Sequence, residues 1–104
     1  MSAIADITLE EIVAKLRGVA PAIRAEGVSK LAIFGSRARG DARPDSDLDV
    51  LIDTEPDSSF GWKNLTGVIA ICRDATGLPT QVTMRSELTP RIAERIADDL
   101  IEVI

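Results

Sequence analysis

Apolar positions along the chain change from helical spacing to short, almost unbroken runs. Between residues 8 and 25 they recur three and four positions apart, which predicts an amphipathic helix. Thr8 and Glu11 form the sequence pattern of a capping box at its start. Pro21 predicts either a kink in this helix or its end just before the proline. Residues 30–35 then form a mostly apolar run that is typical of a buried strand.

The rest of the pattern predicts a series of short elements. They are one or two helical turns over 37–42, strands over 47–53 and 80–85, a helix over 60–75, and a last helix that starts at Thr89-Pro90. Trp62 falls on the apolar stripe of the helix over 60–75, which indicates a core residue or an interface anchor. The apolar tail, residues 100–104, is interpreted as a short strand or a docking surface.

This order of elements predicts an α/β (α+β) fold, in which helices pack mainly on one face of a small mixed β-sheet. About thirteen residues, 35 to 47, connect the first two strands. A full crossover between parallel strands needs about a dozen residues or more, so this length leaves parallel and antiparallel pairing open. At 104 residues the chain is expected to form a single domain over residues 1–104.

Composition excludes several kinds of catalytic site. The chain contains no histidine, which removes Ser-His and Cys-His catalysis and His-ligated zinc. Its one cysteine, Cys72, cannot form an intramolecular disulfide, and its apolar neighbours predict a small buried residue. No apolar run approaches the roughly 20 residues of a membrane span, and the N-terminal residues lack a signal-peptide pattern. A soluble cytoplasmic protein is therefore expected.

Charge argues against general nucleic-acid binding. The net charge is −5, whereas such binding needs clustered lysine and arginine to displace counterions. Arg37, Arg39 and Arg43 form a local basic patch, although each of them, taken singly, is typical of a solvated surface residue.

One segment carries the residue types of a phosphate and metal site. Gly35-Ser36 closes the first predicted strand, where glycine permits close backbone approach and the amides of a following helix attract anions. Asp47 and Asp49 lie two positions apart on the next strand and therefore share one face. Two carboxylates side by side suit Mg²⁺ that is held together with substrate phosphates. Each feature alone is typical of a turn or a solvated surface, but their combination at this spacing favours such a site.

Two motifs in this segment resemble those of a known family. They read Gly35-Ser36-Arg37-Ala38-Arg39-Gly40 and Ser46-Asp47-Leu48-Asp49-Val50. In residue types and spacing they resemble the minimal nucleotidyltransferase (MNT) group of the DNA polymerase beta-like nucleotidyltransferase superfamily. The match is dense over residues 31–53 and looser over the rest of the chain. The resemblance implies a nucleotidyltransferase-type palm fold and a Mg²⁺-dependent transfer of AMP from ATP.

The resemblance also implies a role for each matched position. Gly35 and Ser36 would hold the triphosphate of ATP, and Arg37 and Arg39 would contact phosphates or a partner. The two aspartates would be the catalytic residues, would bind Mg²⁺, and would thereby contribute to nucleotide binding. Attack on the α-phosphoryl group would release pyrophosphate, with paired metal ions stabilising the attacking and leaving oxygens.

The chain departs from the superfamily pattern at the third strand. A third carboxylate is usual there, and the alignment places Gln81 at its position, with no acid between Asp74 and Glu87. Glutamine offers a neutral oxygen and no basicity, so the second Mg²⁺ is expected to be held weakly. Nucleotide binding should survive better than transfer. Asp53 is a poor substitute, because strand rise places it roughly 13 Å from Asp49.

Members of the MNT group typically pair, as antitoxins, with a small helical HEPN toxin, and some transfer AMP to it. The partners implied by the resemblance are therefore such a toxin and a nucleoside triphosphate. Two functions remain open for this chain: adenylyl transfer to the partner, and neutralisation of the partner by binding alone. The apolar tail indicates a partner or a second copy, so hetero- and homo-oligomers are both compatible with the sequence.

Overall fold

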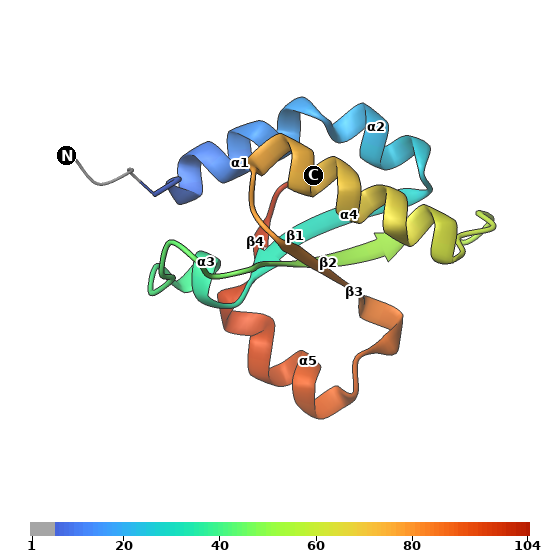
Figure 1. Ribbon diagram of the computed structural model, residues 1–104. Coiled ribbons are helices and arrows are strands. Elements are labelled where there is room, and N and C mark those ends of the chain that lie inside the picture. The colour runs from blue at the N-terminus through green and yellow to red at the C-terminus, as the bar shows by residue number, and fades with distance from the viewer. Residues whose placement is uncertain (1–5) are drawn as a thin grey trace.

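The computed structural model describes residues 6–104 and arranges them around a four-stranded mixed β-sheet (Figure 1). The strands are β1 Val28–Phe34, β2 Leu48–Thr54, β3 Thr80–Met84 and β4 Ile101–Glu102, and they lie in the order β3-β2-β1-β4. The helices are α1 Leu9–Gly18, α2 Ala20–Ala25, α3 Ser36–Arg39, α4 Trp62–Thr76 and α5 Pro90–Ile96, with 3-10 helices η1 Arg85–Glu87 and η2 Ala97–Asp99. The predicted fold class, with a small mixed sheet, is confirmed.

The first predicted helix is in fact two helices. Thr8 caps α1: its side-chain oxygen accepts a hydrogen bond from the Glu11 backbone N–H at 3.1 Å, and the Glu11 carboxylate accepts one from the Thr8 N–H at 3.3 Å. The helix ends at Gly18, and α2 begins two residues later. Pro21 lies in the first turn of α2, where a backbone N–H would have no partner within the helix. The break therefore precedes the proline.

Strand pairing answers the question that chain length left open. β1 and β2 are antiparallel, with Phe34 opposite Asp49. β2 and β3 are parallel and are joined by α4, with Asp49 opposite Gln81. Because of these directions, the end of β1 and the starts of β2 and β3 meet at one end of the sheet. The predicted phosphate corner, the acid pair and Gln81 all belong to this end.

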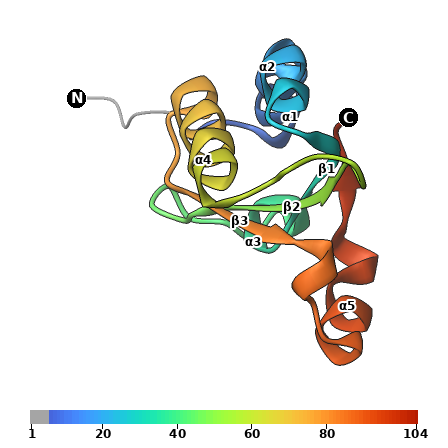
Figure 2. The same cartoon turned by 90° about the vertical axis from the view of Figure 1, so that its right-hand side faces the viewer.

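One face of the sheet is covered by α1, α2 and α4 (Figure 2). The core between these helices and the sheet is made of aliphatic side chains from both layers, and Cys72 of α4 is buried among them as predicted. The members from β2 alternate along the strand, which leaves Asp49 and Asp53 on the opposite face. The buried core residues are Ile12, Leu16, Ile23, Val28, Leu31, Ile33, Leu48, Val50, Ile52, Val68, Cys72, Leu78 and Val103.

The C-terminal tail forms the short edge strand β4, as one of the two interpretations predicted. Ile101 and Glu102 pair antiparallel with β1, and the Val103 N–H donates to the Leu31 carbonyl at 2.9 Å. The Val103 side chain is buried in the core. The tail therefore completes the sheet.

α5 lies on the side of the sheet opposite α1, α2 and α4, and it projects away from the sheet (Figures 1 and 2). None of its residues is buried. Helices thus pack mainly on one face of the sheet, as expected from the sequence.

The interpretation of Trp62 as a core residue is wrong. It is the first residue of α4 and is 72% exposed. Its ring lies 5.9 Å from the Lys63 ammonium nitrogen instead of packing over the sheet. A role as an interface anchor stays a prediction.

Candidate active site

The turn at the end of β1 depends on glycine at position 35. Gly35 has φ +75° and ψ −157°, a region that is open almost only to glycine. A Cβ atom at this position would overlap the nearer carboxylate oxygen of Asp49 and would lie 3.2 Å from its Cγ. The Asp49 carboxylate therefore occupies the space that a side chain at position 35 would need. Ser36 follows as the first residue of α3, and its hydroxyl has no hydrogen-bond partner within residues 6–104.

Asp47 and Asp49 face the same space. Asp47 is exposed and precedes β2, whereas Asp49 is the second residue of the strand and is half-buried. Burial is the largest cause that raises the pKa of Asp49, and the like charge of Asp47 raises it further. The Asp47 carboxylate is thus close enough for its charge to disfavour the ionised form of Asp49.

Arg39 faces the acid pair from α3. Its positive charge lowers the pKa of Asp49 and partly offsets the two effects that raise it. The guanidinium is exposed and also pairs with Asp41 at 3.2 Å and with Asp99 of η2 at 3.5 Å. These carboxylates raise the pKa of Arg39, so the guanidinium stays charged. Arg39 is therefore a charged, exposed side chain within electrostatic reach of Asp49.

Gln81 stands where the sequence comparison placed the missing third carboxylate. It is opposite Asp49 in the β2–β3 register, and its side-chain amide donates a hydrogen bond to Asp47 at 3.3 Å. The carboxylate next along β2, Asp53, is instead paired with Arg85 at 2.9 Å. The described part of the chain thus offers two acids and one amide at this end of the sheet.

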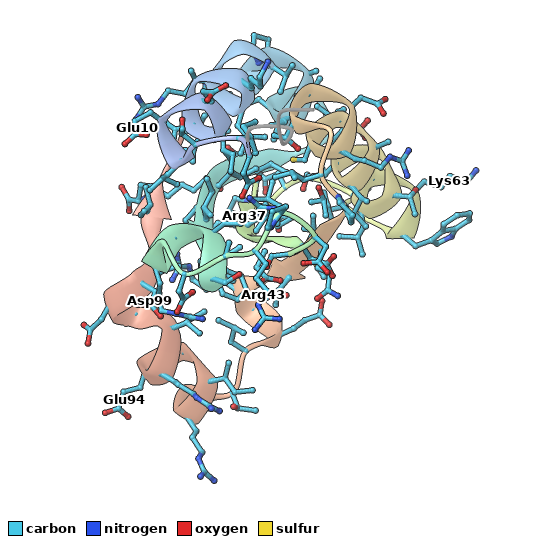
Figure 3. The ribbon with its side chains drawn as sticks, turned by 60° about the vertical axis from the view of Figure 1, so that its left-hand side comes forward. Glu10, Arg37, Arg43, Lys63, Glu94 and Asp99 are labelled. Atoms are coloured by element: carbon cyan, nitrogen blue, oxygen red, sulfur yellow. The ribbon has the colours of Figure 1, made fainter. Side chains whose placement is uncertain are left out.

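Arg37 is not the solvated residue that the sequence suggested, and that prediction is wrong. It is only 4% exposed. One guanidinium nitrogen donates to both carboxylate oxygens of Asp6 at 3.0 Å, and the other donates to the backbone carbonyls of Pro44 and Ser46. In Figure 3 the side chain of Arg37, the second residue of α3, lies inside the fold, in contrast to the outward-pointing Lys63. Its Nε lacks an acceptor among the described residues, and the proposed phosphate contact of this side chain stays a prediction.

Comparison with known proteins places this geometry in a family. The model of the family described as "Nucleotidyltransferase domain" matches residues 10–103. The chain belongs to the nucleotidyltransferase domain family. The predicted relationship to nucleotidyltransferases is thereby confirmed.

Relatives within the nucleotidyltransferase domain family have matching length and fold. The chain is 32% identical over 98 residues to the protein adenylyltransferase MntA of Thermococcus cleftensis, which covers 93% of this chain and 97% of MntA. A solved structure provisionally assigned as a minimal nucleotidyltransferase superposes with a TM-score of 0.79 at 26% identity, over 94% of this chain and 98% of that one. A toxin–antitoxin structure with AMP-PNP has a TM-score of 0.65 at 12% identity, over 94% and 73% of the two chains, and this likeness is one of fold alone.

The residues at this candidate site fit a Mg²⁺ ion that shares its ligands with a nucleotide. Asp47 and Asp49 supply hard oxygen ligands, and Mg²⁺ usually adds phosphate oxygens and water to one or two carboxylates. Within residues 6–104 no group of three or more His, Cys, Asp and Glu side chains converges on one point. Burial first, and the like charge of Asp47 second, disfavour the ionised form of Asp49, and a bound divalent cation would favour that form. The donor set therefore fits one such ion better than two.

Some partners in this site have no sequence signal. Asp6 and Asp99 contact Arg37 and Arg39 from 31 and 60 residues away along the chain. Neither acid lies in a recognisable motif. The position of an arginine next to the glycine corner is a useful hint that such partners exist, because an arginine held inside a fold needs acceptors for its charge.

No helix in the part of the chain that the structure covers has the length and apolarity needed to cross a membrane.

Proposed function

We propose that this protein is a Mg²⁺-dependent protein adenylyltransferase that transfers AMP from ATP to a HEPN-type toxin and so acts as its antitoxin. The observation that carries the proposal is the contact between the Gly35 backbone and the Asp49 carboxylate, with Asp47 beside them. The corner that would hold phosphate and the two acids that would bind the metal ion thus lie together, which supports the proposal. The 32% identity to the adenylyltransferase MntA supports the choice of AMP as the transferred group.

In the proposed reaction, a hydroxyl oxygen of the partner forms a bond to the α-phosphorus of ATP. The bond between that phosphorus and the oxygen that bridges to the β-phosphate breaks, pyrophosphate leaves, and the hydroxyl proton passes to water. Ser36 and the corner backbone would bind phosphate oxygens, and the charge of Arg39 would stabilise the developing negative charge. Mg²⁺ held by Asp47 and Asp49 would neutralise charge on the triphosphate.

A labelling experiment tests the proposed transfer. The protein is incubated with α-labelled ATP, Mg²⁺ and a HEPN-type toxin, and label on the toxin is measured. Asp49→Asn should abolish labelling. Asp53→Asn is the matched control, because it removes a carboxylate from the same face of β2 that is bound to Arg85 instead. Absence of label with the wild-type chain, or undiminished label with Asp49→Asn, would overturn the proposal.

Neutralisation by binding alone is a second candidate, and Gln81 is the observation that favours it. An amide in the position of the third acid accepts no proton, and loss of a general base typically slows a reaction by about 10²–10⁴-fold. In this case Asp47→Asn and Asp49→Asn should still rescue the growth of cells that express the toxin. If either variant folds and binds the toxin but loses rescue, binding alone is insufficient and the enzymatic proposal is favoured.

A further inference from the structure

Arg37 joins the two halves of the candidate site from inside the fold. It is the residue after Ser36, so its backbone belongs to the phosphate corner. Its guanidinium reaches the other half, where one nitrogen donates to the Ser46 carbonyl at 3.0 Å and to the Pro44 carbonyl at 3.3 Å. Ser46 immediately precedes Asp47. A single buried side chain thus connects the corner to the backbone that presents the first acid.

The segment before Asp47 has little other support from the sheet. It forms a turn in which the Ser46 N–H donates to the Arg43 carbonyl at 2.9 Å, and the Ser46 hydroxyl accepts from the Arg43 N–H at 2.8 Å. Regular pairing with β3 begins only beyond Asp47, where the Leu48 N–H donates to the Pro79 carbonyl at 2.8 Å. Arg37 is therefore the side chain that fixes this turn to the body of the fold.

Asp6 completes the arrangement by fixing the direction of the guanidinium. Both of its carboxylate oxygens accept from the same nitrogen of Arg37 at 3.0 Å, which compensates the charge of a side chain that is 4% exposed. With that nitrogen engaged by Asp6, the other nitrogen faces the two carbonyls. The planar fork of arginine suits these two sets of acceptors, whereas a lysine ammonium offers a single point charge.

We propose that Arg37 is a positioning residue that sets the place of Asp47 for metal binding and does not contact the nucleotide. This inference rests on the proposed function, because it assigns a role toward the metal that Asp47 and Asp49 would hold. It differs from the role that the sequence motif suggests for this arginine, which is contact with phosphate. The two roles predict different behaviour when no phosphate is present.

The test is binding of Mn²⁺ alone, as a probe for Mg²⁺, measured by electron paramagnetic resonance without nucleotide. Arg37→Lys should weaken Mn²⁺ binding by about tenfold to a hundredfold, the usual effect of losing a group that orients a metal ligand. Arg43→Lys is the matched control on the same segment and should leave binding unchanged. Asp6→Asn should produce a smaller loss in the same direction. Thermal unfolding of each variant checks that the fold is retained.

The outcomes separate this inference from the proposed function. Equal Mn²⁺ affinity of the wild type and Arg37→Lys would overturn the positioning role and favour a phosphate contact. Failure of the wild-type chain to bind Mn²⁺ would count against the metal site itself, and so against the proposed function. If Arg37→Lys does not fold, Asp6→Asn carries the test, and unchanged Mn²⁺ binding in that variant overturns the inference.

Discussion

The two sides of the candidate active site differ in how firmly the fold fixes them. The nucleotide side, defined as Gly35, α3 and the acid pair, is held by the buried Arg37 and by a glycine whose backbone conformation would strain any other residue. The acceptor side, defined as the start of β3 with Gln81 and the helix α5, is open, and none of the α5 residues is buried. Under the proposed function, this difference means that the fold specifies how the nucleotide is held and leaves the approach of the acceptor to the partner.

The largest expected effect on the candidate site itself comes from changing the nucleotide side with Gly35→Ala. The strained backbone should lower the free energy of unfolding by about 1–3 kcal/mol. Displacement of the Asp49 carboxylate should weaken binding of Mg²⁺·AMP-PNP by up to about a hundredfold. Calorimetric titration and thermal unfolding measure the two effects.

Gly40→Ala is the matched control for this variant. Gly40 also has positive φ, at +84°, but no atom lies within 4 Å of a Cβ atom built there. It should lose stability while keeping nucleotide affinity. If both variants lose affinity equally, the overlap with Asp49 is not what makes the corner depend on glycine.

The role of the acceptor side is tested by Gln81→Glu, which places a third acid beside Asp47 and Asp49. The rate of AMP transfer should rise by up to about a hundredfold, the lower end of what a general base contributes. Affinity for Mg²⁺·AMP-PNP should change much less. Thr83→Glu, on the same face of β3, adds the same charge opposite Leu51 and should not raise the rate. Single-turnover labelling separates these outcomes, and an unchanged rate in Gln81→Glu would show that the third acid is not what limits transfer.

The features of the candidate site were not equally predictable from the sequence. The corner and the acid pair follow from local motifs and strand periodicity, because close approach and shared faces are encoded within a few residues. The position of Gln81 followed instead from the resemblance to the superfamily pattern. The partners of Arg37 and Arg39 were not predictable, since Asp6 and Asp99 reach them only through the tertiary fold.

The elements of the fold show the same division. Capping at Thr8 and the helix start at Thr89-Pro90 were correctly predicted, because both depend on neighbours three residues away. The antiparallel pairing of β1 and β2 was left open, because connection length does not determine it. The exposure of Trp62 was missed because helical spacing identifies a stripe and does not show how far that stripe extends beyond the sheet.

A smaller effect is expected from Cys72, which is buried in the core between α4 and the sheet. Burial raises the pKa of the Cys72 thiol to about 11, from 9.0 in an unfolded chain. The folded state therefore keeps this proton when the unfolded state loses it. The stabilising difference is fully present below pH 9 and is lost between pH 9 and 11, by at most about 1.4 kcal/mol per pH unit. Denaturant unfolding of the wild type and Cys72→Ala across this range should show the slope only in the wild type. Parallel slopes would mean that water reaches the thiol in the folded protein.

The smallest effect is expected on the acceptor side, where Ile92 of α5 is 43% exposed. Ile12 of α1 belongs to the core, is 1% exposed, and serves as the comparison. Ile12→Ala should lower the free energy of unfolding by about 2–5 kcal/mol, because it leaves a cavity in the core. Ile92→Ala should change it by about 0.5 kcal/mol or less, since the side chain is partly hydrated already and alanine favours a helix. Denaturant unfolding of the isolated chain measures both. A large loss with Ile92→Ala that depends on protein concentration would show that α5 is covered by a second copy, and the acceptor side would then be closed in the free protein.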